Sequence, residues 1–178
     1  MIANARLKRV FGDFASEARW INRILLATDF SAASGAATSQ AIELAAQLGA
    51  ELIAVSVIEP RALRLPGGRP ASRVDQVRAA REEAAQDLVA DGRAVGVKIE
   101  FLVWVGEPGD RIVEAASAEA ADLIVVGSHG RGSVGRFLIG SVSDQVVRHA
   151  TCPVMVVRGA ATESAEGGYV QTPTEGDR

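Results

Sequence analysis

The residues most able to bind a ligand are the glycines of a stretch near the C-terminal end of the chain. Between residues 127 and 141, glycine recurs at positions 127, 130, 132, 135 and 140. Glycine lets a backbone approach a ligand and adopt positive φ, so consecutive N–H groups can form a concave anion site. A helix beginning near Ser141 adds unpaired N–H groups and the positive end of its dipole. The pattern therefore predicts a phosphate site.

Ser141 has more than one possible role in this site. Together with Asp144, three residues later, it matches the capping box of a helix N-terminus. Its hydroxyl could therefore cap the helix, contact phosphate, or alternate between the two.

Two common phosphate loops fit the stretch poorly. A P-loop needs Gly-Lys followed by Ser or Thr, and the sequence has no such triplet here. Residues 130–135 read GxGxxG, but the dinucleotide fingerprint belongs to a β-α-β unit that begins a fold and has an acidic residue about 20 positions later. Here a single predicted strand follows, and it ends without a carboxylate.

The elements that must hold this loop alternate between strands and helices. Apolar runs predict strands at 23–28, 52–58, 98–105, 123–126 and 154–157. Helical spacing predicts a helix from Ser31 or Ser34 to Gly49, one over 72–91 that Gly92 ends, one beginning near Pro108, and one over 141–150. We predict an α/β fold, a single doubly wound sandwich around a five-stranded parallel sheet.

Ligands of such sheets bind beyond the carboxyl ends of the strands, where the strand order reverses. Asp29 and Gly127 both follow predicted strand ends. We therefore expect residues far apart in the sequence to meet at one site.

The glycine spacing resembles that of nucleotide-binding universal stress proteins. Gly127, two residues, Gly130, nine residues and then Gly140-Ser141 reproduce the family's motif. The segments 24–31, 122–130 and 152–157 also look like the family's first strand with its acidic loop, its lead into the motif, and its closing strand. The resemblance covers residues 21–158 and implies a Rossmann-like fold similar to the adenine nucleotide alpha hydrolases.

The resemblance also implies a role for individual residues. Asp29 matches an acidic residue near the ribose and phosphates, and Val57 matches a position whose backbone meets adenine. Arg131 stands where the family often has a basic residue that could pair with phosphate. The predicted nucleotide site comprises Ala27, Thr28, Asp29, Val57, Gly127, His129, Gly130, Arg131, Gly140, Ser141, Val142 and Ser143.

Taken singly, these residues have simpler interpretations. Gly127 alone could end a strand, Asp29 alone is typical of a turn, and His129 alone is typical of a loop. Cys152 and Trp104 are expected to pack. It is the joint spacing that favours a nucleotide site.

Charge and composition exclude other classes of function. The net charge is −3, and residues 159–178 alone contribute −3 (one arginine against four carboxylates), so the rest of the chain is balanced. This balance argues against unspecific nucleic-acid binding.

Cys152 is the only cysteine. Apolar runs are too short for a membrane helix, and no apolar stretch follows the basic residues at 6–9, so we expect a cytoplasmic protein without a secretory signal.

The two ends of the chain differ from the predicted domain at 21–158. Leu7, Val10, Phe11 and Phe14 are spaced as on an amphipathic helix, so residues 1–20 are predicted to be an N-terminal extension with a helix over 5–18. Such a helix could pack on this domain or on a partner subunit. Residues 159–178 are polar and acidic, and we expect a disordered tail.

We expect a stress-response protein whose binding of ATP, or another adenine nucleotide, changes its conformation or its partners. Asp29 could help to hold a magnesium ion. No paired base and nucleophile and no cluster of metal ligands is evident, which disfavours a dedicated enzyme. Slow ATP hydrolysis and an interaction module without nucleotide function remain as alternatives. The apolar last strand at 154–157 is expected to lie at an edge of the sheet, which predicts a homodimer formed by pairing with its own copy.

Overall fold

The computed structural model describes residues 21–63, 70–128 and 140–158, and within them the strands and helices follow the predicted order. The predictions for residues 1–20 and 159–178, and those for His129, Gly130 and Arg131, fall outside the described residues. The elements are β1 (Arg23–Ala27), α2 (Ala32–Leu48), β2 (Glu51–Ile58), the short 3-10 helix η2 (Pro60–Leu63), α3 (Pro70–Ala94), β3 (Ile99–Val105), α4 (Pro108–Ala118), β4 (Leu123–Gly127), α5 (Ser141–His149) and β5 (Val154–Val157).

The strands form one parallel sheet in the order β3-β2-β1-β4-β5. The chain builds outward from β1 through β2 to β3, then crosses back to place β4 on the other side of β1. The strand order therefore reverses between β1 and β4. This confirms the predicted five-stranded, doubly wound fold, and in such folds ligands bind at the carboxyl ends of the two strands where the order reverses.

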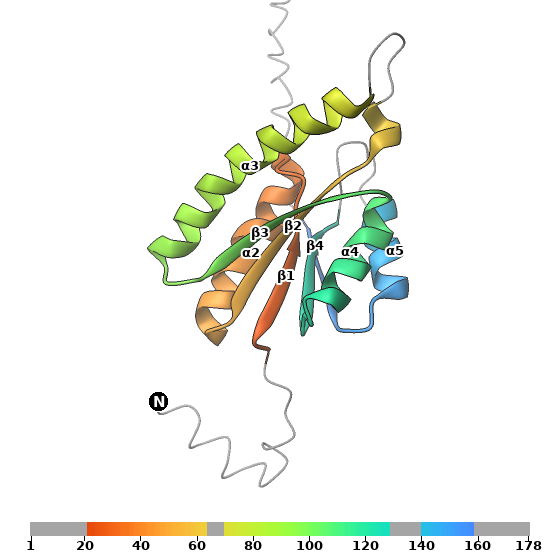
Figure 1. The fold of residues 1–178 in the computed structure, drawn as a ribbon. Helices are drawn as coiled ribbons and strands as arrows, with labels where there is room; N and C mark the ends of the chain where they lie inside the picture. The colour runs from red at the N-terminus through yellow and green to blue at the C-terminus, as the bar shows by residue number, and fades with distance from the viewer. Residues whose placement is uncertain (1–20, 64–69, 129–139, 159–178) are drawn as a thin grey trace, which may run out of the picture.

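Alternating side chains of the strands pack against helices on both faces of the sheet. One face carries Leu26, Ala54 and Val125 in a core with the alanines of α2 and with Leu88 of α3. The other face carries Leu25 and Val55 in a core with α4 and α5. Figure 1 shows the sheet between these two helix pairs. The buried β-branched strands and alanine-rich helices explain why few aromatic residues are needed.

Glycine was predicted to end α2 and α3, and the structure confirms the first prediction and corrects the second. Ser31 caps α2, and Gly49 ends it in the left-handed conformation at φ 68°. The prediction that Gly92 ends α3 is wrong, because the helix continues to Ala94. Gly96, at φ +79°, makes the reversal instead, with the N–H of Val97 donating to the Gly92 carbonyl at 2.8 Å. A Cβ on Gly92 would lie 2.3 Å from Cδ1 of Ile99, so this glycine serves close packing.

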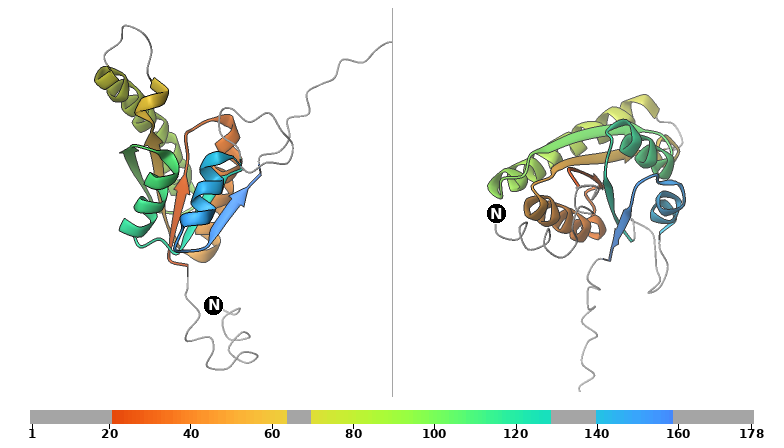
Figure 2. Two further views of the ribbon diagram at one scale, coloured as in Figure 1. Left: turned by 90° about the vertical axis from the view of Figure 1, so that its right-hand side faces the viewer. Right: turned by 90° about the horizontal axis from the view of Figure 1, so that it is seen from below.

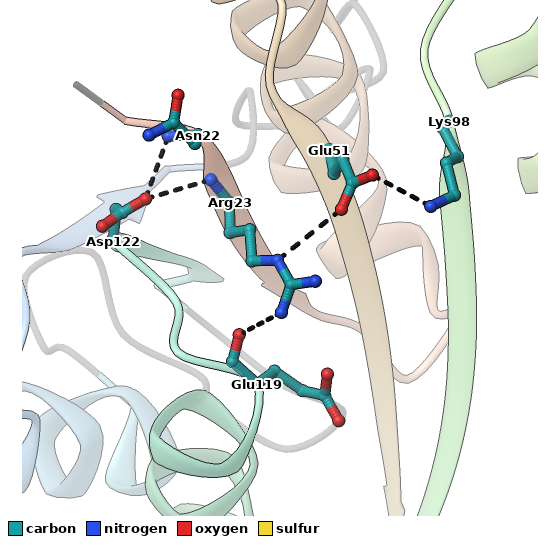
Figure 3. Close-up of polar contacts among 6 residues, drawn as sticks. All are labelled: Asn22, Arg23, Glu51, Lys98, Glu119 and Asp122. Carbon is teal, nitrogen blue, oxygen red and sulfur yellow. Dashed lines mark hydrogen bonds and ion pairs between the residues drawn. The ribbon is translucent and has the colours of Figure 1, made fainter.

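At the amino ends of the strands, Asp122 joins β4 to β1. Its Oδ2 accepts the backbone N–H of Asn22 at 2.9 Å and that of Arg23 at 3.1 Å. Arg23 Nη1 in turn donates to the Glu119 carbonyl at 2.8 Å. Figure 3 shows these contacts. Residues about 100 positions apart in the sequence are thereby held at the entry to the central strand.

The same network continues across β2 to β3 through Glu51. Its carboxylate lies 3.6 Å from Arg23 Nε and 2.9 Å from Lys98 Nζ. The hydrogen bond from Lys98 and the charges of Lys98 and Arg23 lower the pKa of the Glu51 carboxyl, and desolvation opposes them. All three side chains are substantially exposed, so this is a surface network that aligns strand starts.

The last strand, β5, lies at a border of the sheet beside β4, which confirms its predicted edge position (Figure 2). Its residues are all half-buried. Among the described residues, no helix is both long and apolar enough to cross a membrane.

Candidate functional site

The turn from β1 into α2 is held by hydrogen bonds between neighbouring side chains and backbone. Thr28 is buried, and its Oγ1 accepts the N–H of Phe30 at 3.1 Å. Asp29 Oδ1 accepts the N–H of Ser31 at 3.0 Å, and Ser31 Oγ accepts the N–H of Ser34 at 3.3 Å. These bonds let Phe30 adopt φ 55°, which non-glycine residues rarely do. The turn therefore fixes Asp29 just beyond the carboxyl end of β1.

The two buried hydroxyls of this turn have a defined direction of donation. Ser34 Oγ donates its one proton to the Ser31 carbonyl at 2.9 Å. The contact of 3.2 Å between Thr28 Oγ1 and Ser34 Oγ must then be donated by Thr28. Phe30 also packs edge-on against Phe101 of β3, with ring centroids 5.5 Å apart. The turn is thus anchored to α2 and to the sheet.

Ser56 and Arg81 contribute to the same region, and neither was predicted from the sequence. Ser56 is fully buried in the apolar strand β2, and its hydroxyl donates to the Thr28 carbonyl at 2.7 Å. Arg81 of α3 donates from Nη1 to Ser56 Oγ. A lone serine in a strand and an arginine on a charged helix give no signal in sequence. Their connection exists only once β2 lies beside β1 and α3 packs on β2.

Val57 directs its backbone polar groups toward β1 at the carboxyl edge of the sheet. The Thr28 N–H donates to the Val55 carbonyl at 3.0 Å, whereas the Gly106 N–H donates to the Ile58 carbonyl, on the β3 side. Backbone polar groups change sides at each residue of a strand, so Val57, like Val55, directs its N–H and C=O toward β1. Because β1 ends at Ala27, opposite Val55, the backbone of Val57 lies beyond the end of its neighbour.

The end of β4 and the start of α5 form the other part of this edge of the sheet. Gly127 closes β4 opposite Val157. The Gly140 N–H donates to the Ser128 carbonyl at 2.7 Å. The buried Ser143 hydroxyl lies 3.4 Å from the same carbonyl and donates to the Gly140 carbonyl at 2.9 Å. These bonds bring the two ends of the glycine stretch together in front of α5.

Helix α5 begins with N–H groups that have no acceptor within the helix. Its first intrahelical bond runs from the Asp144 N–H to the Gly140 carbonyl at 2.8 Å. The N–H groups of Ser141, Val142 and Ser143 precede that bond and point out of the helix N-terminus. The capping-box interpretation of Ser141 is wrong, because Gly140 is the N-cap and Ser141 is the first helical residue. The exposed hydroxyl of Ser141 is therefore not required for capping.

The predicted site residues in the described part of the chain all lie at this edge of the sheet. They come from the end of β1, the end of β2, the end of β4 and the start of α5. They are Ala27, Thr28, Asp29, Val57, Gly127, Gly140, Ser141, Val142 and Ser143.

This edge offers a few specific chemical groups. The N-terminus of α5 offers donors and a positive dipole end, which favour an anion. Val57 offers one backbone donor beside one acceptor. Asp29 adds a carboxylate, with Oδ1 accepting from Ser31. Asp144 lies in the first turn of α5, and its hydrogen bond with Arg148 lowers the pKa of this carboxyl. No group of three or more metal-ligating side chains occurs within residues 21–63, 70–128 and 140–158.

Two solved structures that resemble this chain contain adenine nucleotides. A universal stress protein solved in complex with cAMP has a TM-score of 0.57 at 27% identity, covering 78% of this chain and 97% of that one. A universal stress protein from Archaeoglobus fulgidus, in complex with dAMP, has a TM-score of 0.56 at 26% identity, covering 76% and 97%.

Other comparisons cover the domain in sequence and in structure. A universal stress protein from Thermus aquaticus is 38% identical over 137 residues, which is 76% of this chain and 97% of the relative. The structure of universal stress protein UspA from Lactobacillus plantarum has a TM-score of 0.71 at 29% identity, covering 78% and 98% of the two chains. The family model described as the universal stress protein family matches residues 21–158. The chain therefore belongs to the universal stress protein family.

Proposed function

We propose that the protein binds ATP or another adenine nucleotide at the carboxyl ends of β1 and β4, and acts in a stress response through nucleotide-dependent conformation or partner binding. One observation carries the proposal. The N-terminus of α5, the Asp29 turn and the backbone of Val57 lie at the same edge of the sheet, at the point where the strand order reverses.

Each part of this edge suits a part of the ligand. The N–H groups of Ser141, Val142 and Ser143 suit phosphate, because they combine unpaired donors with the helix dipole. The N–H and C=O of Val57 suit adenine, which offers an amino donor beside a ring-nitrogen acceptor. The Asp29 carboxylate suits ribose hydroxyls. The cAMP and dAMP complexes of related proteins support an adenine ligand.

We extend the site to His129, Gly130 and Arg131, as the glycine spacing suggests. A magnesium ion would arrive with the triphosphate, and Asp29 is the carboxylate we assign to it. The described residues at this edge include no paired base and nucleophile, so we assign binding as the function and rank slow hydrolysis second.

The test is to identify what the protein carries. The full chain is purified without added nucleotide and denatured, and the released small molecules are analysed by mass spectrometry. Calorimetric titration of the stripped protein with ATP, AMP and GTP then measures affinity. We expect adenine nucleotides to be released and to bind more tightly than GTP. Absence of any nucleotide, together with no heat on titration with ATP, would contradict the proposal.

We also propose that β5 pairs with its own copy to form a homodimer in the cytoplasm. The carbonyls of Pro153 and Val157 accept bonds from β4, so the N–H groups of Val154 and Val156 face away from the sheet. Val154 and Val156 are half-buried against the core beside α5, so charged side chains there would destabilise the domain as well as the dimer. Val156→Pro instead removes one outward donor from an edge strand, where proline is tolerated.

On light scattering, the full chain should have the mass of a dimer, and Val156→Pro that of a monomer. Val156→Thr keeps the N–H and should remain dimeric. A monomeric unmodified chain at micromolar concentration would rule the dimer out.

A further inference from the structure

The carbonyl of Thr28 is bonded in a way that a regular parallel ladder would not produce. Thr28 lies opposite Ser56, one step past the Ala27–Val55 pair. In a parallel ladder, the N–H of Thr28 donates to Val55 and its carbonyl accepts from Val57. The first bond is present at 3.0 Å. The second is absent from the described backbone bonds, and side chains approach the Thr28 carbonyl instead.

Ser56 and Arg81 act on this carbonyl together. The Ser56 hydroxyl donates its one proton to the Thr28 carbonyl at 2.7 Å, so it must accept the bond from Arg81 Nη1. Arg81 Nη1 itself lies 3.5 Å from the Thr28 carbonyl. The two hydrogen bonds therefore form a chain, in which Arg81 of α3 donates to Ser56 of β2, and Ser56 donates to the Thr28 carbonyl after β1. A positively charged donor strengthens such a chain of hydrogen bonds.

The consequence falls on Val57. Its N–H faces β1, but among the described backbone bonds none joins it to the Thr28 carbonyl, which is directed to the Ser56 hydroxyl instead. We propose that Arg81, acting through Ser56, is a positioning residue of the nucleotide site, which holds the Thr28 carbonyl out of the ladder and leaves the Val57 N–H for the edge of the base. The part of this inference that concerns affinity rests on the proposed function.

The same contacts hold the turn that carries Asp29. A peptide group is planar, so fixing the Thr28 carbonyl also fixes the plane in which the Asp29 N–H lies. The next residue, Phe30, takes the rare positive φ. Arg81 therefore stabilises the departure of the chain from β1, in addition to keeping the Val57 N–H available.

The first arm of the experiment uses the stripped protein, without nucleotide. Amide hydrogen exchange is followed by NMR in the full chain and in the variants Ser56→Ala and Arg81→Met. In Ser56→Ala the hydroxyl that engages the Thr28 carbonyl is gone and the ladder can close, so protection of the Val57 amide should rise about tenfold or more, as expected for one added hydrogen bond. In Arg81→Met the Ser56 hydroxyl remains but loses its charged donor, so protection should rise less. Unchanged protection of Val57 in both variants would overturn the proposal.

The second arm measures ATP affinity by calorimetry. Each single variant should bind ATP about tenfold more weakly than the unmodified chain. The double variant should bind ATP no more weakly than the weaker of the two single variants, because the two residues act as a unit. Arg78→Met is the matched control, since Arg78 lies on the same helix but donates to the Val103 carbonyl of β3. It should change neither the Val57 amide nor the affinity.

Urea unfolding of each variant separates loss of the fold from loss of positioning. If Arg81→Met fails to fold, Ser56→Ala, which removes one oxygen atom, carries the test, with Arg81→Lys beside it. Weaker ATP binding with an unchanged Val57 amide would count against the proposal. A different result is that the Val57 amide becomes protected in the variants while the unmodified chain binds no adenine nucleotide. That result would support the role of Arg81 in positioning the Thr28 carbonyl and would reject the proposed function.

Discussion

The two ends of the same sheet hold their polar groups in different ways. At the amino ends, carboxylates and cations bind one another and the backbone, as Asp122 does with Asn22 and Arg23, and Glu51 with Lys98. At the carboxyl ends, the polar groups of the β1 turn are mostly buried hydroxyls and backbone groups. At the amino ends the polar groups bind one another within the protein. At the carboxyl ends, by contrast, the N–H groups at the start of α5 point outward.

This difference separates stability from binding. Contacts that satisfy each other within the protein contribute to the free energy of unfolding and leave nothing for a ligand. Unpaired donors at a helix N-terminus do the reverse, because they gain their partner when an anion binds. Substitutions at the two ends should therefore have separable effects.

The largest effect is expected at the carboxyl end, from Gly140→Leu. Gly140 has φ −61° and ψ 155°, which any residue can adopt, so the backbone and its bond to Ser128 should survive. A bulky side chain in front of α5 would block phosphate. ATP affinity should fall at least about 30-fold, which corresponds to roughly 2 kcal/mol of lost helix-terminus interaction.

Calorimetry measures this change, and circular dichroism checks the fold. Gly35→Leu is the matched control, because a Cβ at this exposed position of α2 meets no atom within 4 Å. Unaltered ATP affinity in Gly140→Leu would break the comparison, since phosphate would then bind elsewhere.

A smaller and opposite pattern is expected at the amino end, from Asp122→Ala. The change removes the acceptor of two backbone N–H groups, those of Asn22 and Arg23. Because both donors are partly reached by water, the free energy of unfolding should fall by about 1–2 kcal/mol. Urea unfolding measures the loss. Asp122→Asn keeps a carbonyl oxygen and should lose less.

ATP affinity should remain within about twofold in both Asp122 variants, because the effect of a distant contact adds independently. A large loss of affinity in Asp122→Ala, at a temperature where the variant is folded, would show that the two ends are coupled.

The smallest effect is expected from the Glu51 network. Contacts with Lys98 and Arg23 lower the pKa of Glu51 in the folded state, so the charged form is favoured by folding. That stabilisation is present above the unfolded pKa of about 4.3 and is lost as the pH falls through the lowered folded value. The urea midpoint of the unmodified chain should exceed that of Glu51→Gln at pH 7 and approach it near pH 3.

Lys98→Met removes the partner and should reproduce the Glu51→Gln curve. High salt should reduce the difference at pH 7, because the pair is exposed. A difference between Glu51→Gln and the unmodified chain that persists unchanged at low pH would mean that packing, rather than charge, is lost.

The sequence predicts the fold well because its signals are local. Apolar runs of strand length alternate with helical spacing, and glycine marks the turns, as at Gly49. The same rule misleads at Gly92, where packing against Ile99 requires a glycine inside a helix. Ser141 was misassigned because a capping pattern has the same letters whether the helix begins at that serine or one residue earlier.

The candidate site could be predicted only in part. The glycine spacing and Asp29 stand out because they interrupt apolar runs at strand ends. Ser56 and Arg81 do not, since each is ordinary in its own segment and the link between them depends on three elements meeting. Hydrogen bonds between side chains of different elements leave no periodic pattern in the sequence from which they could be predicted.

The central place of β1 has a consequence for synthesis on the ribosome. One side of β1 finds β2 within a few dozen residues, but its other partner, β4, follows about 100 residues later. At about 5–20 residues per second, roughly 5–20 s pass between the synthesis of β1 and that of β4. During that time an apolar strand has one open edge, and a nascent chain stalled before β4 would be a target for chaperones.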